Sequence, residues 1–277
     1  MGPRPRGRRV TAATTVPKLV VNGYYGKQNL GDEAFVCVLK DQFPDARFCN
    51  HSNPHPTEPQ FKGYEEHVII GGGEFSPWMV AGAPPGAKLY GLSLGLIRDG
   101  YDAERIELLR RFTYLSVRDV YSLELALAWG LKAVFSGDLA YLLRPGAADP
   151  TFREKFVVIP QRNIAPWPFL EGIPSEKLLF SRFHPQDLEN IDTRGIPAVF
   201  ADSPTEMLAS IATASRVLVW GRLHAKILAH AVGVPWVEFG PDRKSVALAA
   251  TMTKYSVKEL KQSATNAITS IKEKIYA

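Results

Sequence analysis

The sequence predicts an α/β protein with two domains, each built on a parallel sheet. Short apolar runs alternate with helical patterns along most of the 277 residues. The runs are apolar at nearly every position, which is typical of strands covered on both faces. A segment rich in proline and glycine, 145–150, interrupts the alternation, which then starts again. The length suits one large domain or two of roughly 100–150 residues each, and the interruption favours two.

In the first half, apolar runs predict strands, and apolar residues three and four positions apart predict helices. The predicted strands are Lys18–Asn22, His67–Ile70, Lys88–Leu92, Tyr114–Val117 and Ala133–Ser136. The predicted helices are Asp32–Phe43, Ala103–Phe112 and Val120–Trp129, the last closed by Gly130.

The second half repeats the alternation and ends in a long helix. The predicted strands are Phe156–Ile159, Lys177–Phe180, Ala198–Phe200, Val217–Trp220 and Trp236–Phe239. The predicted helices are Pro185–Arg194, Thr205–Ala214 and Ala225–Val232. An apolar stripe from Val257 to Ile275 predicts a final amphipathic helix. We therefore expect a basic tail (1–17), a first domain (18–145), a second domain (151–255) and a C-terminal helix (256–277).

Most of the net positive charge lies in the tail. The net charge is +5, and four of the five units come from Arg4, Arg6, Arg8 and Arg9. Because the rest of the chain is nearly neutral, contact with nucleic acid is not expected outside the tail. The tail is predicted to be disordered and solvated, with contact to an anionic surface or polymer as the alternative.

The composition limits the expected location and cofactors. Hydrophobic residues make up 45% and charged residues 22%, as in globular proteins. No window approaches the roughly 18 consecutive apolar residues of a membrane span, and no apolar stretch follows the tail as in a signal peptide. With only two cysteines, we expect a cytoplasmic protein. The sequence has no cysteine–histidine cluster and no metalloprotease or hydrolase motif, so neither a metal nor a cofactor is expected.

The candidate site residues follow predicted strands. Ligands bind beyond the carboxyl ends of strands in open parallel sheets, so two sheets would place a site in the cleft between them. Residues 23–33 follow the first strand and open a helix, and their glycines allow a ligand to approach closely. Asn29 and Gly31 are candidate contacts, with an ordinary glycine-rich turn as the alternative. Asp32 and Glu33 either serve the ligand or only complement the helix dipole.

Three further strand ends carry weaker signals. Residues 71–73 are all glycine, which removes side chains where a ligand could pass, and Glu74 follows them. Tight packing is the alternative for these glycines. Arg118 either binds a ligand or pairs with its neighbour Asp119. Asp138 occupies the same kind of position and is similarly ambiguous.

The sharpest signal is the run Gly221-Arg222-Leu223-His224, where a strand ends and a helix begins. The planar guanidinium of Arg222 suits a phosphate or a carboxylate, and the helix N-terminus adds donors for the same anion. His224 at that position is expected to act as an acid or base near neutral pH, with a core histidine as the alternative. Arg162 and Lys244 follow two other strands and are secondary candidates for anion contacts.

Six motifs occur in order between residue 20 and about residue 244. They are GYYGKQNLGDEAF, VIIGGGEF, SVRDVYS, SGDLAYLL, FHPQD and SPTEMLASIATASRVLVWGRLHAKILAHAVGVPWV. Together they resemble the polysaccharide pyruvyltransferase family. The resemblance implies a GT-B-like fold of two Rossmann-like domains facing a cleft, with the C-terminal helix packing back on the first domain. Arg222, Leu223 and His224 align with the family's RLH donor-site motif, whereas Trp220 and Glu74 depart from its pattern.

The resemblance also implies an activity, in which the pyruvyl group of phosphoenolpyruvate moves onto two sugar hydroxyls as a ketal and phosphate is released. The expected catalytic residues are His224, Asp32 and Glu33. The expected donor-binding residues are Arg222, Leu223, Arg162, Lys244 and Gly221. The expected acceptor-binding residues are Asn29, Gly31, Gly72, Gly73, Glu74 and Arg118.

Phosphoenolpyruvate is the expected co-substrate of this transferase, and a saccharide or glycolipid-linked saccharide is the expected acceptor. Two alternatives stay open: a GT-B glycosyltransferase with a nucleotide-sugar donor, and a repurposed family member with a non-polysaccharide acceptor. The sequence leaves the oligomeric state open.

Overall fold

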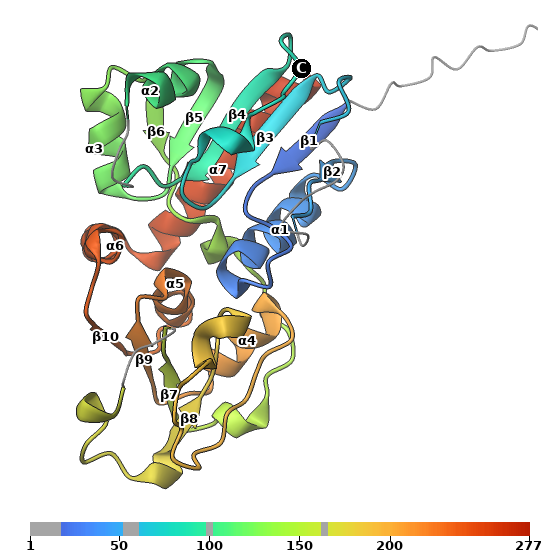
Figure 1. The fold of residues 1–277 in the computed structure, drawn as a ribbon. Helices are drawn as coiled ribbons and strands as arrows, with labels where there is room; N and C mark the ends of the chain where they lie inside the picture. Colours follow the sequence, from blue (N-terminus) through green and yellow to red (C-terminus); the bar gives the residue numbers. More distant parts are fainter. Residues whose placement is uncertain (1–17, 52–60, 98–101, 162–165) are drawn as a thin grey trace, which may run out of the picture.

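Figure 1 shows the computed structural model of the protein, which describes residues 18–51, 61–97, 102–161 and 166–277. Two parallel sheets lie one above the other in this view. We call the six-stranded sheet with helices α1 to α3 the first lobe, and the four-stranded sheet with α4 and α5 the second lobe. The predicted tail, 1–17, lies outside the described residues, and so does Arg162.

The first sheet has the strand order β2-β1-β3-β4-β5-β6, and its neighbouring strands are parallel. Its strands are β1 (Leu19–Asn22), β2 (Arg47–Phe48), β3 (His67–Gly71), β4 (Lys88–Leu94), β5 (Phe112–Val117) and β6 (Ala133–Phe135). Its helices are α1 (Leu30–Gln42), α2 (Ala103–Arg110) and α3 (Val120–Ala128). The five predicted strands of this half are confirmed within two residues at each end. The sequence does not predict β2, because two residues are too few to show an apolar pattern.

The second sheet has the strand order β10-β9-β7-β8, again with parallel neighbours. Its strands are β7 (Phe156–Ile159), β8 (Leu178–Phe180), β9 (Arg216–Trp220) and β10 (Trp236–Phe239). The helices that follow or flank them are α4 (Pro204–Ile211), α5 (Leu223–Ala231), α6 (Arg243–Lys254) and α7 (Val257–Tyr276). Four of the five strands predicted for this half are confirmed.

Two predicted elements of the second half are wrong. The expected helix Pro185–Arg194 is a single 3₁₀ turn, η6 (Pro185–Leu188). The chain cannot continue as a right-handed helix there, because Asn190 and Arg194 have φ angles of 61° and 51°, in the left-handed region. The expected strand Ala198–Phe200 is absent, and only its first residue forms an isolated bridge, to β8.

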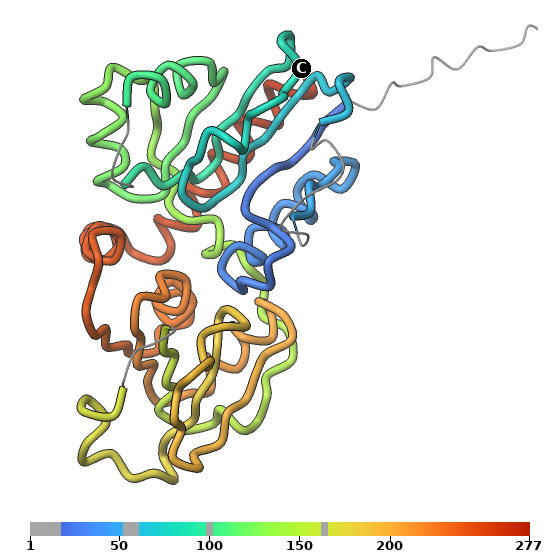
Figure 2. Tube along the Cα trace, in the orientation of Figure 1, coloured from blue at the N-terminus to red at the C-terminus, as the bar shows by residue number. Residues whose placement is uncertain are grey.

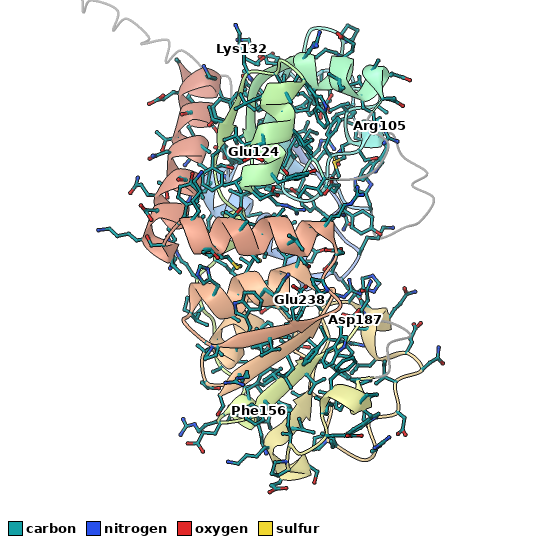
Figure 3. All side chains as sticks on the ribbon, turned by 90° about the vertical axis from the view of Figure 1, so that its left-hand side faces the viewer. Arg105, Glu124, Lys132, Phe156, Asp187 and Glu238 are labelled. Carbon is teal, nitrogen blue, oxygen red and sulfur yellow. The ribbon has the colours of Figure 1, made fainter. Side chains whose placement is uncertain are left out.

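The last two helices connect the lobes. The sequence predicts only a loop where α6 begins, but Asp242 caps this helix by accepting the N–H of Ser245 at 2.8 Å. The helix α6 contacts both α5 and α3, and the hydroxyl Oγ1 of Thr251 accepts the N–H of Val120 at 3.0 Å. Figure 3 shows α6 lying across the middle of the molecule.

The C-terminal helix α7 packs back on the first lobe, as predicted. It contacts β4 and the 3₁₀ turn η2 (Leu139–Leu142), and in Figure 1 it runs behind the first sheet. Its apolar stripe is buried at Leu260, Ala264, Ala267, Ile268, Ile271 and Ile275. Burial of a stripe with this spacing is the main force that holds an amphipathic helix in place.

One apolar core runs through both lobes. It includes Val21 and Phe35 of the first lobe, Val219 and Ala225 of the second, and Ile268 of α7. The trace in Figure 2 passes from the first lobe to the second after η2 and returns through α6 and α7. The two sheets are therefore joined by packing as well as by the chain, and the strand ends that face each other are held in place.

Candidate active site

The candidate site is a cavity of about 400 Å³ between the lobes, beyond the carboxyl ends of the strands of both sheets. Ten of the predicted site residues line it: Asn29, Asp32, Gly73, Glu74, Arg118, Gly221, Arg222, Leu223, His224 and Lys244. Seven residues outside that set complete the lining: Tyr24, Ser76, Trp78, Met79, Gln161, Phe183 and Asp242. The strand-end rule thus brings together motifs that are nearly 200 residues apart in the sequence.

Three predicted residues do not line this cavity. Gly31 lies directly beneath the imidazole of His224, so that a Cβ atom at Gly31 would collide with the ring. Gly72 has a φ of 67° and lies against the ring of Phe35, so it serves packing. Glu33 points elsewhere: its Oε1 accepts the N–H of Gly26 at 2.7 Å, and it lines a second cavity of about 530 Å³. The structure therefore does not bring Glu33 to the site with Asp32 and His224.

The turn between β9 and α5 positions Arg222. Gly221 has a φ of 62°, and a Cβ atom there would collide with the side chain of Gln161, so this turn requires glycine. The guanidinium of Arg222 forms an ion pair with Asp187, whose side chain is fully buried. The other carboxylate oxygen of Asp187 accepts the N–H groups of Phe183 and His184, at 3.0 and 2.8 Å. Asp187 is thus fixed by the backbone, and it fixes Arg222 in turn.

Asp187 is a residue that sequence reasoning does not find. Figure 3 labels it in the second lobe, close to the boundary between the lobes. The available signal is its place in the FHPQD motif, where its carboxylate and the His184 side chain form a reciprocal cap of η6. The expectation of a helix at this place hides that role.

His224 lies at the start of α5, between the two lobes. Its ring meets the ring of Phe35 edge-on, with centroids 5.1 Å apart. Its Nε2 atom lies 3.7 Å from Oδ2 of Asp138, at the beginning of η2 in the first lobe. The side chain of His224 is 11% exposed and that of Asp138 is fully buried. The imidazole is therefore held by first-lobe residues although its backbone belongs to the second lobe.

Asp32 is a buried carboxyl group in the cavity wall. Burial raises its pKa from 3.8 to about 6, and the opposing attractions of His224 and Arg118 are too weak to reverse this effect. Asn29, the N-cap of α1, donates its side-chain N–H to Asp32 Oδ2 at 2.5 Å. A carboxyl group with this pKa can carry or release a proton near neutral pH, which an ordinary aspartate cannot.

Glu74 lies between two cationic side chains that belong to different parts of the chain. Its Oε2 atom is 3.4 Å from Nη2 of Arg118 and 3.6 Å from Nζ of Lys244 at the start of α6. Arg118 is buried and also approaches Asp119 at 3.5 Å, so the predicted pairing of these neighbours is present. The cavity is lined by three cationic side chains, Arg118, Arg222 and Lys244, and by three carboxyl groups, Asp32, Glu74 and Asp242. An anionic ligand would therefore compete with carboxylates that already pair with these cations.

The sequence profile of the polysaccharide pyruvyl transferase family matches residues 29–243. The chain belongs to this family. The matched span begins at the N-cap of α1 and ends at the first residue of α6, and it contains every cavity-lining residue except Tyr24 and Lys244. No curated protein matches the sequence closely enough to count as a relative.

Solved structures show what fold this pyruvyl transferase family member has. The wall teichoic acid polymerase TagF, solved with CDPG, matches with a TM-score of 0.50 at 10% identity, over 93% of this chain and 83% of that chain. The GtfA/B complex bound to UDP and GlcNAc matches with a TM-score of 0.32 at 11% identity, over 76% of this chain and 56% of that chain. The first match shows that the fold is GT-B-like, as predicted.

Two further features concern only the described part of the chain. Among those residues, no group of three or more histidines, cysteines, aspartates or glutamates could hold a metal ion. None of the helices found there has the length and apolar character needed to cross a membrane.

Proposed function

We propose that this pyruvyl transferase family member moves the pyruvyl group of phosphoenolpyruvate onto two hydroxyls of a saccharide, forming a ketal and releasing phosphate. One observation carries the proposal: Asp32, with a pKa near 6, shares a cavity with His224 and with cations from both lobes. Phosphoenolpyruvate is a small polyanion whose reaction begins with a proton transfer. The cavity offers both the countercharge and the proton-transfer groups for that chemistry.

The donor's two anionic groups have suitable partners at the start of α5. Arg222, held by Asp187, offers a planar fork to the phosphate or the carboxylate. The N-terminal N–H groups of α5 and the ammonium of Lys244 add to the same field. Because Arg222 is already oriented by a buried partner, little side-chain entropy remains to be lost when the donor binds.

The proposed reaction needs one acid and one base. The acid protonates the methylene carbon C3 of phosphoenolpyruvate, which leaves positive charge at C2. A sugar hydroxyl attacks C2 and gives its proton to the base. The phosphate then takes the proton held by the base and leaves with the electron pair of its C–O bond, and a second hydroxyl of the same sugar attacks C2 and gives its proton to the carboxylate of the acid, which restores both groups. Asp32 and His224 are the proposed acid–base pair, and each positioned proton transfer contributes roughly 10²–10⁴-fold to the rate.

Calorimetry with phosphoenolpyruvate tests the donor directly. We expect saturable binding to the wild-type protein and a loss of about 10–100-fold in affinity for Arg222→Ala, since a hydrogen bond to a charged group contributes about 1.5–3 kcal/mol. The matched control is Arg216→Ala, because Arg216 lies exposed at the other end of β9. A uridine diphosphate sugar is titrated in parallel.

The acceptor is sought by ³¹P NMR, which follows the release of phosphate from phosphoenolpyruvate in the presence of oligosaccharides with neighbouring free hydroxyls. Saccharide-dependent phosphate release, lost in Arg222→Ala, is the expected result. Binding of the nucleotide sugar alone would replace the proposal with glycosyl transfer. Phosphate release that requires a non-carbohydrate diol would place the activity in a repurposed member of the family.

A further inference from the structure

Asp138 and His224 come from opposite lobes and face each other with unsatisfied polar atoms. Asp138 uses its Oδ1 to accept the N–H of Ala140 at 2.9 Å, which caps η2. Its Oδ2 points at Nε2 of His224, 3.7 Å away. Within the described residues, both atoms are buried and neither has a hydrogen-bond partner. Burying a carboxylate oxygen without a hydrogen-bond partner lowers the stability of the folded protein, so a functional reason for this pair of atoms is to be sought.

The pair becomes satisfied if Nε2 carries a proton and donates it to Oδ2. The distance of 3.7 Å is too long for that bond. However, Asp138 caps η2, which packs directly against α5, so a small rotation of the His224 ring or of the Asp138 carboxylate shortens it. Catalytic hydrogen bonds are often long before the substrate is bound and tighten in the complex.

The surroundings of the ring leave little choice of orientation. On one side it meets the edge of Phe35, and on another the backbone of Gly31 lies so close to Cγ and Nδ1 that a Cβ atom there would collide with them. Among the described residues, Nε2 is one of the buried atoms without a partner and Nδ1 is not. Because His224 lines the cavity, Nδ1 is the nitrogen that can meet a substrate on the side away from Gly31. Asp32, on the same cavity wall, acts on His224 electrostatically.

We propose that Asp138 is a positioning residue that holds His224 in the tautomer with the proton on Nε2, so that Nδ1 presents its lone pair to the cavity. This inference rests on the proposed function only for the step that His224 performs. In that step a sugar hydroxyl attacks C2 of the enolpyruvyl group and gives its proton to Nδ1. The resulting imidazolium is stabilised by the carboxylate of Asp138, and Asp32 is then the acid that protonates C3.

The substitution Asp138→Asn tests the tautomer. The amide oxygen is the only atom of asparagine that can cap the N–H of Ala140, so the NH₂ group turns toward Nε2 of His224. An NH₂ group donates, so Nε2 must accept and the ring proton moves to Nδ1. The matched control is Asp149→Asn, because Asp149 caps η3 (Pro150–Phe152) through Thr151 N–H at the same 2.9 Å, away from the cavity.

The readout is the ¹⁵N NMR spectrum of the full chain labelled at histidine, recorded at pH 8.5, where an ordinary imidazole is neutral. Comparison with His224→Gln assigns the signals. We expect an Nε2–H tautomer in the wild type and in Asp149→Asn, and an Nδ1–H tautomer in Asp138→Asn. Turnover should fall at least about 100-fold in kcat for Asp138→Asn, with the KM for phosphoenolpyruvate changed less than about threefold.

An unchanged tautomer in folded Asp138→Asn would overturn the proposal. If that variant does not fold, the wild-type spectrum decides, because an Nδ1–H tautomer there contradicts the assigned contact. A tautomer switch together with a wild-type enzyme that shows no turnover of phosphoenolpyruvate would refute the proposed function and leave the positioning of His224 by Asp138 intact.

Discussion

The raised pKa of Asp32 has a consequence for stability that can be measured without any substrate. A rise from 3.8 to about 6 means that the folded protein holds a proton that the unfolded chain has already released between pH 4 and 6. In that window stability therefore falls as the pH rises. At about 1.4 kcal/mol per pH unit, the total loss is about 3 kcal/mol by neutral pH.

The substitution Asp32→Asn removes this loss, because a neutral amide replaces the carboxyl group at nearly the same volume. We expect equal stability of the two proteins near pH 4 and an advantage of about 3 kcal/mol for Asp32→Asn above pH 6. With an unfolding entropy of about 2.1 cal/mol/K per residue over 277 residues, this corresponds to an increase of about 5 °C in Tm. Thermal unfolding followed by circular dichroism at pH 4 to 8 measures it.

The control is Asp41→Asn, because Asp41 is exposed near the other end of α1. We expect its difference in Tm from the wild type to stay constant over the same pH range. A pH-independent difference between Asp32→Asn and the wild type would refute the reasoning, since it would show that Asp32 holds no extra proton in the folded state.

Two further predictions concern packing. Gly31→Ala places a methyl group against the imidazole of His224 and should lower kcat, measured by phosphate release, about 100-fold while the protein stays folded. The control is Gly86→Ala, which should leave kcat unchanged because Gly86 has open space around it. Equal kcat values for the wild type and both variants would contradict the close contact between Gly31 and His224. Thr251→Val leaves the half-buried N–H of Val120 without its acceptor, and the free energy of unfolding measured in urea should fall by about 1 kcal/mol. An unchanged urea midpoint would show that this bond between α6 and α3 is not needed for stability.

The sequence predicts the sheets well because a strand that is covered on both faces is apolar at nearly every position, and such a run is visible in the sequence itself. It fails where another force decides the local structure. The 3₁₀ turn η6 does not extend into a helix because the backbone enters the left-handed region at Asn190 and Arg194, and α6 owes its position to contacts with α3 and α5. The apolar spacing of these segments does not show either feature.

For the site, strand-end motifs identify the cavity but not the direction of each side chain. Asp32 and Glu33 are adjacent on α1, about 100° apart around the helix, so only one of them can face the cavity. Which one depends on the rotation of α1, and that is set by packing of Phe35 and its neighbours in the core. The approach of Asp138 to His224 is likewise tertiary, because 86 residues separate them.

The position of α7 also determines when, during synthesis, the first sheet can be covered on both faces. The face of the first sheet beside β4 emerges from the ribosome early, but the helix that covers it is made only after the whole second lobe. Until then this apolar face is open to wrong contacts or to chaperones. The first lobe is therefore translated before the second lobe but is completed only after it.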